Sequence, residues 1–418
     1  METVVKTSPS PTADQPSPNG ERPPVMHGLP ENVLFCKRCV MSNQRPSTSP
    51  ELRKKTTRIE TVAFDDDGIC HACKYADFKK TINWAEREAM LVDLLDKHRS
   101  SAGHFDVIVP GSGGKDSIYV SHVLKYRYNM HPLTVTWAPH KYTDIGWKNF
   151  QSWLFKGGFD NILFTPNPKV HATLTRLAFL NLLNPFQPFI IGQKNLAPQM
   201  AVKYGVPLLM YGENQAEYHN KLSETQSPLM SRDHYTGEPG QKYYFGGMHE
   251  DDLAQYDVTP HDLAPYRPIL RSQAEELGIH IHYMSYYHNW VPQEKYYYAV
   301  EHCGFEPNPE RSEGTYSKYA SLDDRIDGFH YYTMFVKFGQ GRAMNDAAHE
   351  IRDGHIEREE AVALIRKYDG EFPKKYFHEF LEYIGITEQQ FWEAVDRNRS
   401  PHLWENRDGK WILKHQVS

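Results

Sequence analysis

The stretch FDVIVPGSGGKDS, residues 105–117, decides the fold of this chain. A short apolar run, residues 105–109, leads into a turn with three glycines, and apolar residues at helical spacing follow. This order predicts a buried strand, a loop and a helix. Glycines let backbone amides turn toward one point, where the N-terminal end of the next helix adds positive potential. The stretch therefore predicts a loop that binds phosphate or pyrophosphate.

Six loop positions are the expected contacts of ATP or of departing pyrophosphate: Ser112, Gly113, Gly114, Lys115, Asp116 and Ser117. The spacing matches neither GxxxxGK[ST] nor GxGxxG. A carboxylate in an anion-binding loop needs a cation, so we expect Asp116 to hold Mg²⁺ on the phosphates. Asp116 and Lys115 are the expected catalytic residues. A surface turn that caps a helix is the ordinary alternative.

Further apolar runs at residues 133–137, 162–164 and 207–211 alternate with helical stretches. This alternation predicts an α/β fold with a parallel sheet covered on both faces. Ligands of such sheets bind beyond the carboxyl ends of the strands.

Five residues stand at these expected strand ends. Thr136 and Trp137 close the second strand and are expected to flank adenine, with a core role for Trp137 as the alternative. Glu213, Asn214 and Gln215 follow the fourth strand and are expected to contact the substrate.

Four segments are expected along the chain. They are a disordered tail over residues 1–28, a zinc ribbon over 29–80, an ATP-binding α/β domain over 81–275 with a polar substrate loop at 213–270, and a mostly helical part over 276–418.

Two CxxC pairs, Cys36 with Cys39 and Cys70 with Cys73, have the spacing of metal ligands. Four thiolates leave no open position on a tetrahedral ion, so the pairs predict a structural zinc ribbon. His71 is the rival ligand within the second pair. The fifth cysteine, Cys303, is expected to be a packed thiol.

The charge balance of 47 basic against 53 acidic residues, a net −6, argues against binding nucleic acid through its phosphates. No apolar run reaches the roughly 18 residues of a membrane span. The N-terminus lacks the basic start and apolar middle of a secretory signal. We therefore expect a cytoplasmic protein without membrane contact.

The loop resembles the signature SGGxDS of the PP-loop ATP pyrophosphatase superfamily, which matches residues 112–117 without a gap. The resemblance implies a PP-loop fold, cleavage of ATP between the α and β phosphates, and an adenylating enzyme. Longer stretches resemble the N-acetyl sugar amidotransferases of bacterial surface-polysaccharide synthesis. They are CKRC, CHAC, VTWAPH (135–140), YGENQAEY (211–218), SLDDRIDGFHYY (321–332), KFGQGRAMNDAAHEIRDGHI (337–356) and KYDGEFP (367–373).

This second resemblance implies a reaction and its participants. The acetamido oxygen of an N-acetylated sugar or sugar nucleotide is adenylated, and ammonia replaces AMP to give an acetamidino group, with ATP, Mg²⁺ and Zn²⁺ as cofactors. Because nothing in the sequence looks like a glutaminase, the resemblance implies a separate glutaminase and a barrel-type subunit that channels ammonia. Asp323, Asp324 and Arg325 are candidates for substrate binding; the acids are otherwise N-terminal helix charges.

Two other functions remain open at this stage. Some tRNA-thiolating enzymes join a PP-loop to CxxC knuckles, and a ribbon can serve as a nucleic-acid module on an inert scaffold. Among the remaining polar clusters, His280 and His282 are interpreted as a solvated strand face. His349, Glu350 and His355 lack HExxH spacing and are not expected to bind metal.

Overall fold

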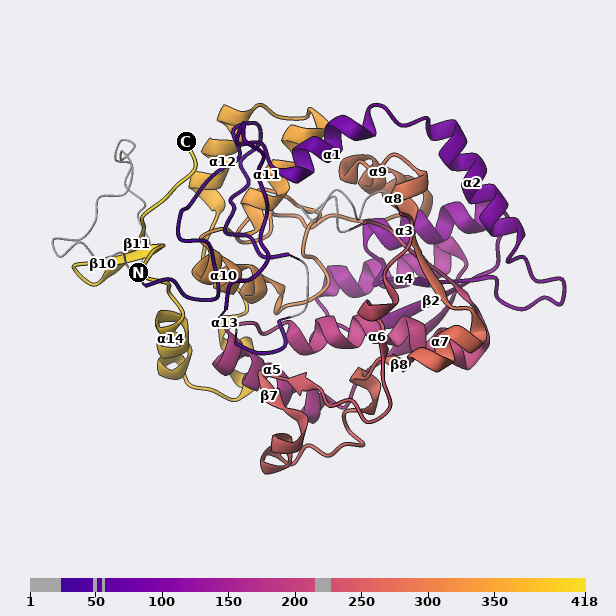
Figure 1. Ribbon diagram of the computed structural model, residues 1–418. Coiled ribbons are helices and arrows are strands. Elements are labelled where there is room, and N and C mark those ends of the chain that lie inside the picture. Colours follow the sequence, from indigo (N-terminus) through magenta and orange to yellow (C-terminus); the bar gives the residue numbers. More distant parts are fainter. Residues whose placement is uncertain (1–23, 48–50, 55–56, 215–226) are drawn as a thin grey trace.

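The computed structural model describes residues 24–47, 51–54, 57–214 and 227–418 (Figure 1). Most of the expected tail and Gln215 lie outside these residues. Within them, no helix combines the length and the apolar character needed to cross a membrane.

The described part of the chain builds a sheet of five parallel strands in the order β3-β2-β1-β4-β9. The strands are β1 (Val107–Pro110), β2 (Pro132–Trp137), β3 (Asp160–Phe164), β4 (Leu208–Tyr211) and β9 (His280–Tyr283). The expected α/β fold with a parallel sheet is confirmed. The order reverses between β1 and β4, and ligands of doubly wound sheets bind at that switch point.

Side chains of the central strand alternate between two buried layers. Val107 and Val109 pack into the layer of α3 (Lys115–His122), whereas Ile108 packs into the layer of α6 (Gln187–Tyr204). Because both faces are covered, the strand reads as an unbroken apolar run in the sequence.

Helices cover both faces of the sheet. α3 packs on α4 (Asp144–Gly157) and α9 (Pro292–Cys303) and continues into the π-helix η1 (Val123–Arg127). On the other face, α6 packs on the strands and on α5 (Pro168–Leu182). Between β4 and β9 lie short elements: η4 (Arg232–His234), β5 (Thr236–Gly237), β6 (Tyr244–Phe245), β7 (Met248–His249), η5 (Glu250–Tyr256), η6 (Ala264–Tyr266), β8 (Ile269–Leu270) and α7 (Arg271–Leu277).

Strand β9 changes two expectations. The sheet extends past residue 275, because β9 pairs with β4 and α9 packs on α3. The face that carries His280 and His282 is not solvated: His282 is buried, its Nε2 lies 2.8 Å from His280 Nδ1, and its Nδ1 lies 2.6 Å from the Tyr287 hydroxyl. Two alternating histidines look polar in sequence, but inside the fold Tyr287 is a partner of His282, and His98 lies 3.0 Å from His280 between their Nε2 atoms.

The N-terminal and C-terminal parts pack together beside the sheet (Figure 1). The N-terminal part contributes α1 (His71–Lys79) and α2 (Trp84–Asp96), and α8 (Met284–Tyr287) packs on α2. The C-terminal elements are α10 (Asp327–Phe338), α11 (Arg342–Asp353), α12 (Arg358–Tyr368), α13 (Phe377–Ile384), α14 (Glu388–Arg397), β10 (Trp404–Arg407) and β11 (Lys410–Leu413). The expected helical character of this part agrees with these elements, apart from the terminal hairpin.

Aromatic rings join the C-terminal helices to α5. Phe329 of α10 stacks on Phe380 of α13 with ring centroids 4.2 Å apart, and Phe179 of α5 stacks on Phe391 of α14 at 5.0 Å. All four rings are buried in the same core as the sheet. This core holds the C-terminal part against the α/β layers.

We expect Phe329→Ala to lower the free energy of unfolding by roughly 3–5 kcal/mol, because it opens a cavity in a closely packed aromatic cluster. Phe155→Ala is the matched control, since Phe155 is 83% exposed and its loss should change stability by no more than about 0.5 kcal/mol. Denaturant unfolding measures both. Equal effects of the two substitutions would contradict the packing described.

Candidate active site

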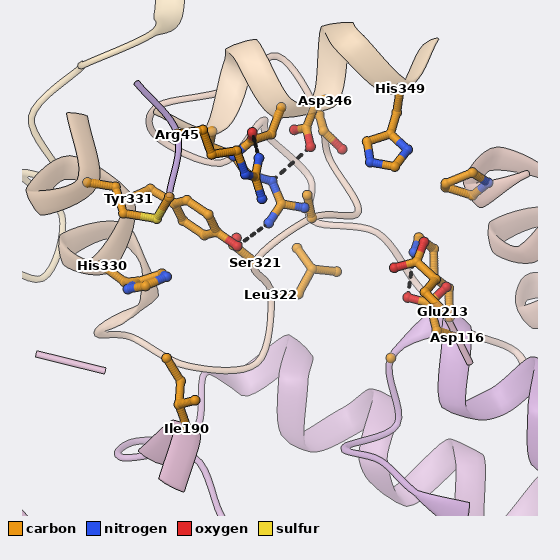
Figure 2. Close-up of a pocket in the computed structure, with 18 of the residues that line it drawn as sticks. Arg45, Asp116, Ile190, Glu213, Ser321, Leu322, His330, Tyr331, Asp346 and His349 are labelled. Atoms are coloured by element: carbon orange, nitrogen blue, oxygen red, sulfur yellow. Dashed lines mark hydrogen bonds and ion pairs between the residues drawn. The ribbon is translucent and has the colours of Figure 1, made fainter. Parts of the chain in front are cut away.

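A cavity of about 820 Å³ lies between the expected phosphate loop and the C-terminal helices (Figure 2). This volume falls within the roughly 300–1,000 Å³ typical of ligand pockets. Its walls combine residues 112–116, residues 317–323, parts of α10 and α11, and an N-terminal segment around Arg45. The site is therefore assembled from all three parts of the chain.

The loop after β1 depends on a glycine in the left-handed region. Gly113 has a φ of +83°, and a Cβ there would lie 2.7 Å from the Cα of Phe150 in α4. Residues with a side chain rarely adopt this φ, and the backbone of α4 leaves no room for one. The tight turn brings the start of α3 to the cavity.

Helix α3 begins at Lys115, directly after this turn, with Gly114 as its N-cap. The first amides of a helix have no carbonyl partner within it, so an anion bound there accepts their hydrogen bonds. Ser112, Gly113, Gly114, Lys115 and Asp116 line the cavity, whereas Ser117 does not. The Ser117 hydroxyl donates to the carbonyl of Gly114 at 3.0 Å.

Lys115 and Asp116 form an ion pair at the mouth of the loop, with 2.6 Å between Nζ and Oδ2. Burial lowers the pKa of Lys115, but the charges of Asp116 and Glu213 raise it above its usual value overall. Lys115 is therefore cationic at neutral pH. Asp116 Oδ1 is buried and has no hydrogen-bond partner among the residues described. A carboxylate oxygen in this state is a suitable ligand for Mg²⁺.

The residues after β4 divide between cavity and core. Glu213 lines the cavity and accepts a hydrogen bond of 2.8 Å from Trp290 Nε1. Asn214 is buried, and its backbone amide donates to the Ser285 hydroxyl at 2.8 Å. Glu213 and the loop thus meet at the switch point between β1 and β4.

Thr136 and Trp137 do not line the large cavity. The Thr136 hydroxyl accepts a hydrogen bond from Asn161 at 3.1 Å. Trp137 is buried against α6, where a Cβ on Gly192 would lie 2.3 Å from its ring. It borders only a space of about 10 Å³ behind the loop, room for no more than a water molecule. The structure thus gives Trp137 the core role that the sequence left as an alternative.

Of the three residues expected to bind substrate, Asp323, Asp324 and Arg325, only the first lines the cavity. Asp323 lines the cavity opposite the loop. Burial raises the pKa of its carboxyl, and a hydrogen bond with Ser112 partly offsets the rise.

Asp324 and Arg325 face away and join the C-terminal part to the loop after β2. The Asp324 carboxylate accepts from the backbone amide and the ring Nδ1 of His140, both at 2.7 Å. Arg325 pairs with Glu379 at 2.9 Å and donates to the carbonyl of Tyr142 at 3.0 Å. These contacts orient the segment that carries Asp323.

Helix α11 forms a wall of the cavity, although no residue of this helix was expected from the sequence to belong to the site. Its cavity-lining side chains follow helical spacing: Arg342, Asn345, Asp346, His349, Glu350 and Asp353. The small residues Ala347 and Ala348 on its other side pack against the cysteine-rich segment. This division into two faces was visible in the residues 342–353, but a polar stripe normally indicates solvent rather than a site.

Burial perturbs the titrating groups of this wall. It lowers the pKa of His349 well below its usual value, and the charges of Arg352 and Arg45 lower it further. It also raises the pKa of the Glu350 carboxyl. His349 is therefore neutral at pH 7, and Glu350 is a stronger base than an exposed glutamate.

The four cysteines of the CxxC pairs meet in one buried cluster, with all sulfurs within 4.8 Å of one another. Cys36 Sγ lies 3.9 Å from Cys73 Sγ, and Cys39 Sγ lies 3.6 Å from Cys70 Sγ. Tetrahedral zinc with bonds of about 2.3 Å places sulfurs roughly 3.8 Å apart. The donor set and its spacing are those of a structural zinc site.

Comparisons with known proteins fall into two groups. Residues 313–417 match the family described as "LPS biosynthesis protein WbpG-like, C-terminal domain". The match supports the resemblance to the surface-polysaccharide amidotransferases. No curated protein matches the chain.

Among solved structures, NMN synthetase from Francisella tularensis is similar at 13% identity over 65% of this chain and 94% of that one, with a TM-score of 0.27. A score this low carries no argument about fold or activity.

Gly113→Ala should weaken binding of a non-hydrolysable ATP analogue at least about tenfold, because strain at this φ and the clash with α4 displace the loop. Gly103→Ala is the control, since Gly103 has a similar φ of +77° but open space around it. Calorimetric titration of both variants measures the difference. Unchanged affinity in the Gly113 variant would separate the loop from ATP.

We expect purified protein to contain about one zinc ion per chain. Cys70→Ser should lose the metal and unfold at a lower temperature, because three thiolates leave the tetrahedron incomplete. Cys303→Ser should keep the zinc, since Cys303 lies outside the cluster. Metal analysis and thermal unfolding test this expectation, which a stable zinc-free protein would refute.

Proposed function

We propose that the protein is an ATP-dependent amidotransferase that converts the acetamido group of an N-acetylated sugar into an acetamidino group, forming AMP and pyrophosphate. One observation carries the proposal: the glycine turn before α3 and the segment that matches the WbpG-like C-terminal family line a single cavity. The family description of that segment supports a role in surface-polysaccharide synthesis. The turn supports the use of ATP.

In the first step, the acetamido oxygen attacks the α phosphorus of ATP, and pyrophosphate leaves. The acetamido nitrogen releases its proton to water, which gives a neutral O-adenylyl imidate. The amides at the start of α3 and the Lys115 ammonium would hold the β and γ phosphates. Mg²⁺ held by Asp116 would supply further positive charge on the phosphates. Asp323, hydrogen-bonded to Ser112 of the loop, would orient the acceptor beside them.

In the second step, ammonia attacks the carbon of the O-adenylyl imidate, and the C–O bond to AMP breaks. The nitrogen must lose a proton as the amidine forms. Glu350 and Asp353 of α11 line the cavity, and burial raises the pKa of both carboxyls. A carboxylate whose pKa is raised toward neutrality is a better general base, so these two are the proposed proton acceptors.

We also propose that ammonia comes from a separate glutaminase through a barrel-type subunit. Cys303 is buried, and burial raises the pKa of its thiol to about 11. A thiol in this state is not the thiolate that a glutaminase nucleophile requires. The same state weakens the alternative of tRNA thiolation, which needs reactive cysteines.

Protein supplied with Mg²⁺, ATP, ammonium and an N-acetylated sugar nucleotide should release AMP and pyrophosphate, and glutamine should not replace ammonium. Asp116→Asn should reduce turnover by at least about a hundredfold, because it removes a ligand charge from the phosphate site. Asp93→Asn in α2 is the matched control, since that carboxylate is exposed and does not line the cavity.

Release of ADP and phosphate instead of AMP and pyrophosphate would contradict the proposal. So would full activity of the Asp116 variant. Chromatographic separation of the nucleotides distinguishes these outcomes directly.

A further inference from the structure

Two guanidinium groups project into the cavity away from the phosphate loop. Arg342 begins α11, and Arg45 comes from the N-terminal segment just after the first cysteine pair. Figure 2 shows Arg45, Tyr331 and His330 on one side of the cavity, with Asp116 and Glu213 on the other. The arginines therefore do not share the place expected for the ATP phosphates.

The orientation of Arg342 is set by its neighbours. Its Nε lies 2.8 Å from Asp346 Oδ1, and its Nη1 donates to the Tyr331 hydroxyl. The Asp369 carboxylate accepts from the Gly341 amide at 2.7 Å and so holds the start of α11 in place. Nη2 of Arg342 has no hydrogen-bond partner within the described chain. A fixed guanidinium plane with a free donor suits a planar or tetrahedral anion.

Arg45 brings a second charge to the same region. Its Nη1 donates to the amide oxygen of Asn345, three residues beyond Arg342. Burial lowers the pKa of Arg45 to about 10, and the charges of Arg352 and Arg342 lower it too. Arg45 is still protonated at neutral pH. Its charge is thus close enough to that of Arg342 for the two to repel, and an anion between them would relieve the repulsion.

The residues that line the cavity around the two arginines differ in chemical character from those at the loop. Ile190, Met334 and Phe338 line the end with the arginines, and His330 Nδ1 is buried without a hydrogen-bond partner among the residues described. Burial and nearby cations lower the pKa of His330 to about 3, so its ring is neutral. The carboxylates of Asp116 and Asp323 lie at the loop end. At the other end, the lining carboxylate of Asp346 is already paired with Arg342. An acceptor with one negative group is therefore favoured with that group beside the arginines and away from the loop.

We propose that Arg342 and Arg45 bind a negatively charged group of the acceptor sugar and thereby position its acetamido group at the phosphate loop. The group is a phosphate of a nucleotide-linked sugar or the carboxylate of a sugar acid, which share this anionic chemistry. The inference rests on the proposed function and names the substrate class of the same site. A neutral sugar would form no ion pair with either guanidinium group.

Binding of three probes tests the proposal: UDP-N-acetylglucosamine, N-acetylglucosaminuronic acid and neutral N-acetylglucosamine. Calorimetry is performed on the full chain saturated with α,β-methylene-ATP, so that the phosphate loop is already occupied. We expect at least one charged probe to bind about tenfold or more tightly than the neutral sugar, and the probe that does so identifies the anion.

Arg342→Gln and Arg45→Gln should each lower the affinity for that probe at least about tenfold, while the affinity for α,β-methylene-ATP is unchanged. Arg342→Lys keeps the positive charge but lacks the paired N–H donors of a guanidinium, so it should reduce the affinity for that probe less than Arg342→Gln does. Arg366→Gln on α12 is the matched control, because its side chain donates to the Val417 carbonyl outside the cavity. Thermal unfolding checks that each variant is folded. If Arg45→Gln does not fold, the comparison of Arg342→Gln with Arg342→Lys decides the outcome.

Three binding results would overturn the proposal. They are equal affinity for the neutral and charged sugars, undiminished binding of the charged probe by the Arg342 variants, and a parallel loss of ATP-analogue binding, which would assign the arginines to ATP. AMP-forming turnover of a neutral sugar would also overturn it but would leave the proposed amidotransferase reaction intact.

Discussion

The site depends on the turn at Gly113. Only a residue without a side chain fits there, because φ is +83° and the backbone of α4 lies against the position of a Cβ. This turn takes the chain from β1 to α3 in a few residues. It directs the first amides of α3 and the ion pair of Lys115 with Asp116 into the cavity rather than into the sheet. Every proposed contact with the phosphates follows from that direction.

Helix α11 lies between the cysteine-rich segment and the cavity. Its alanines pack under the four cysteines, while Arg342, Asp346 and Glu350 line the cavity on its other side. Arg45, six residues beyond Cys39, reaches over to Asn345 of the same helix. The cysteine-rich segment is therefore a wall of the site, and the four-cysteine cluster and the proposed substrate contacts share one packed interface.

Residues 323–325 show that a sequence motif does not predict which of its side chains lines a cavity. Three consecutive polar side chains were equivalent in sequence, yet Asp323 lines the cavity and Asp324 and Arg325 hold residues 140–142 after β2. Successive side chains of an irregular segment point in different directions, and partners more than 180 residues away decide which direction meets the ligand. His282 makes the same point, since Tyr287 and β4 turn a polar strand residue into a buried one.

The sequence by itself determined the parallel sheet, the glycine turn after β1 and the four-cysteine cluster, because each is set by local patterns: strand length, glycine position and CxxC spacing. Only the tertiary structure decided that the polar stripe of α11 faces a cavity, that Arg45 joins Arg342 across 297 positions of the chain, and that Trp137 belongs to the core. Those outcomes depend on which distant surfaces pack together. Such packing is selected by the burial of whole helices and sheets, which no short stretch of residues encodes.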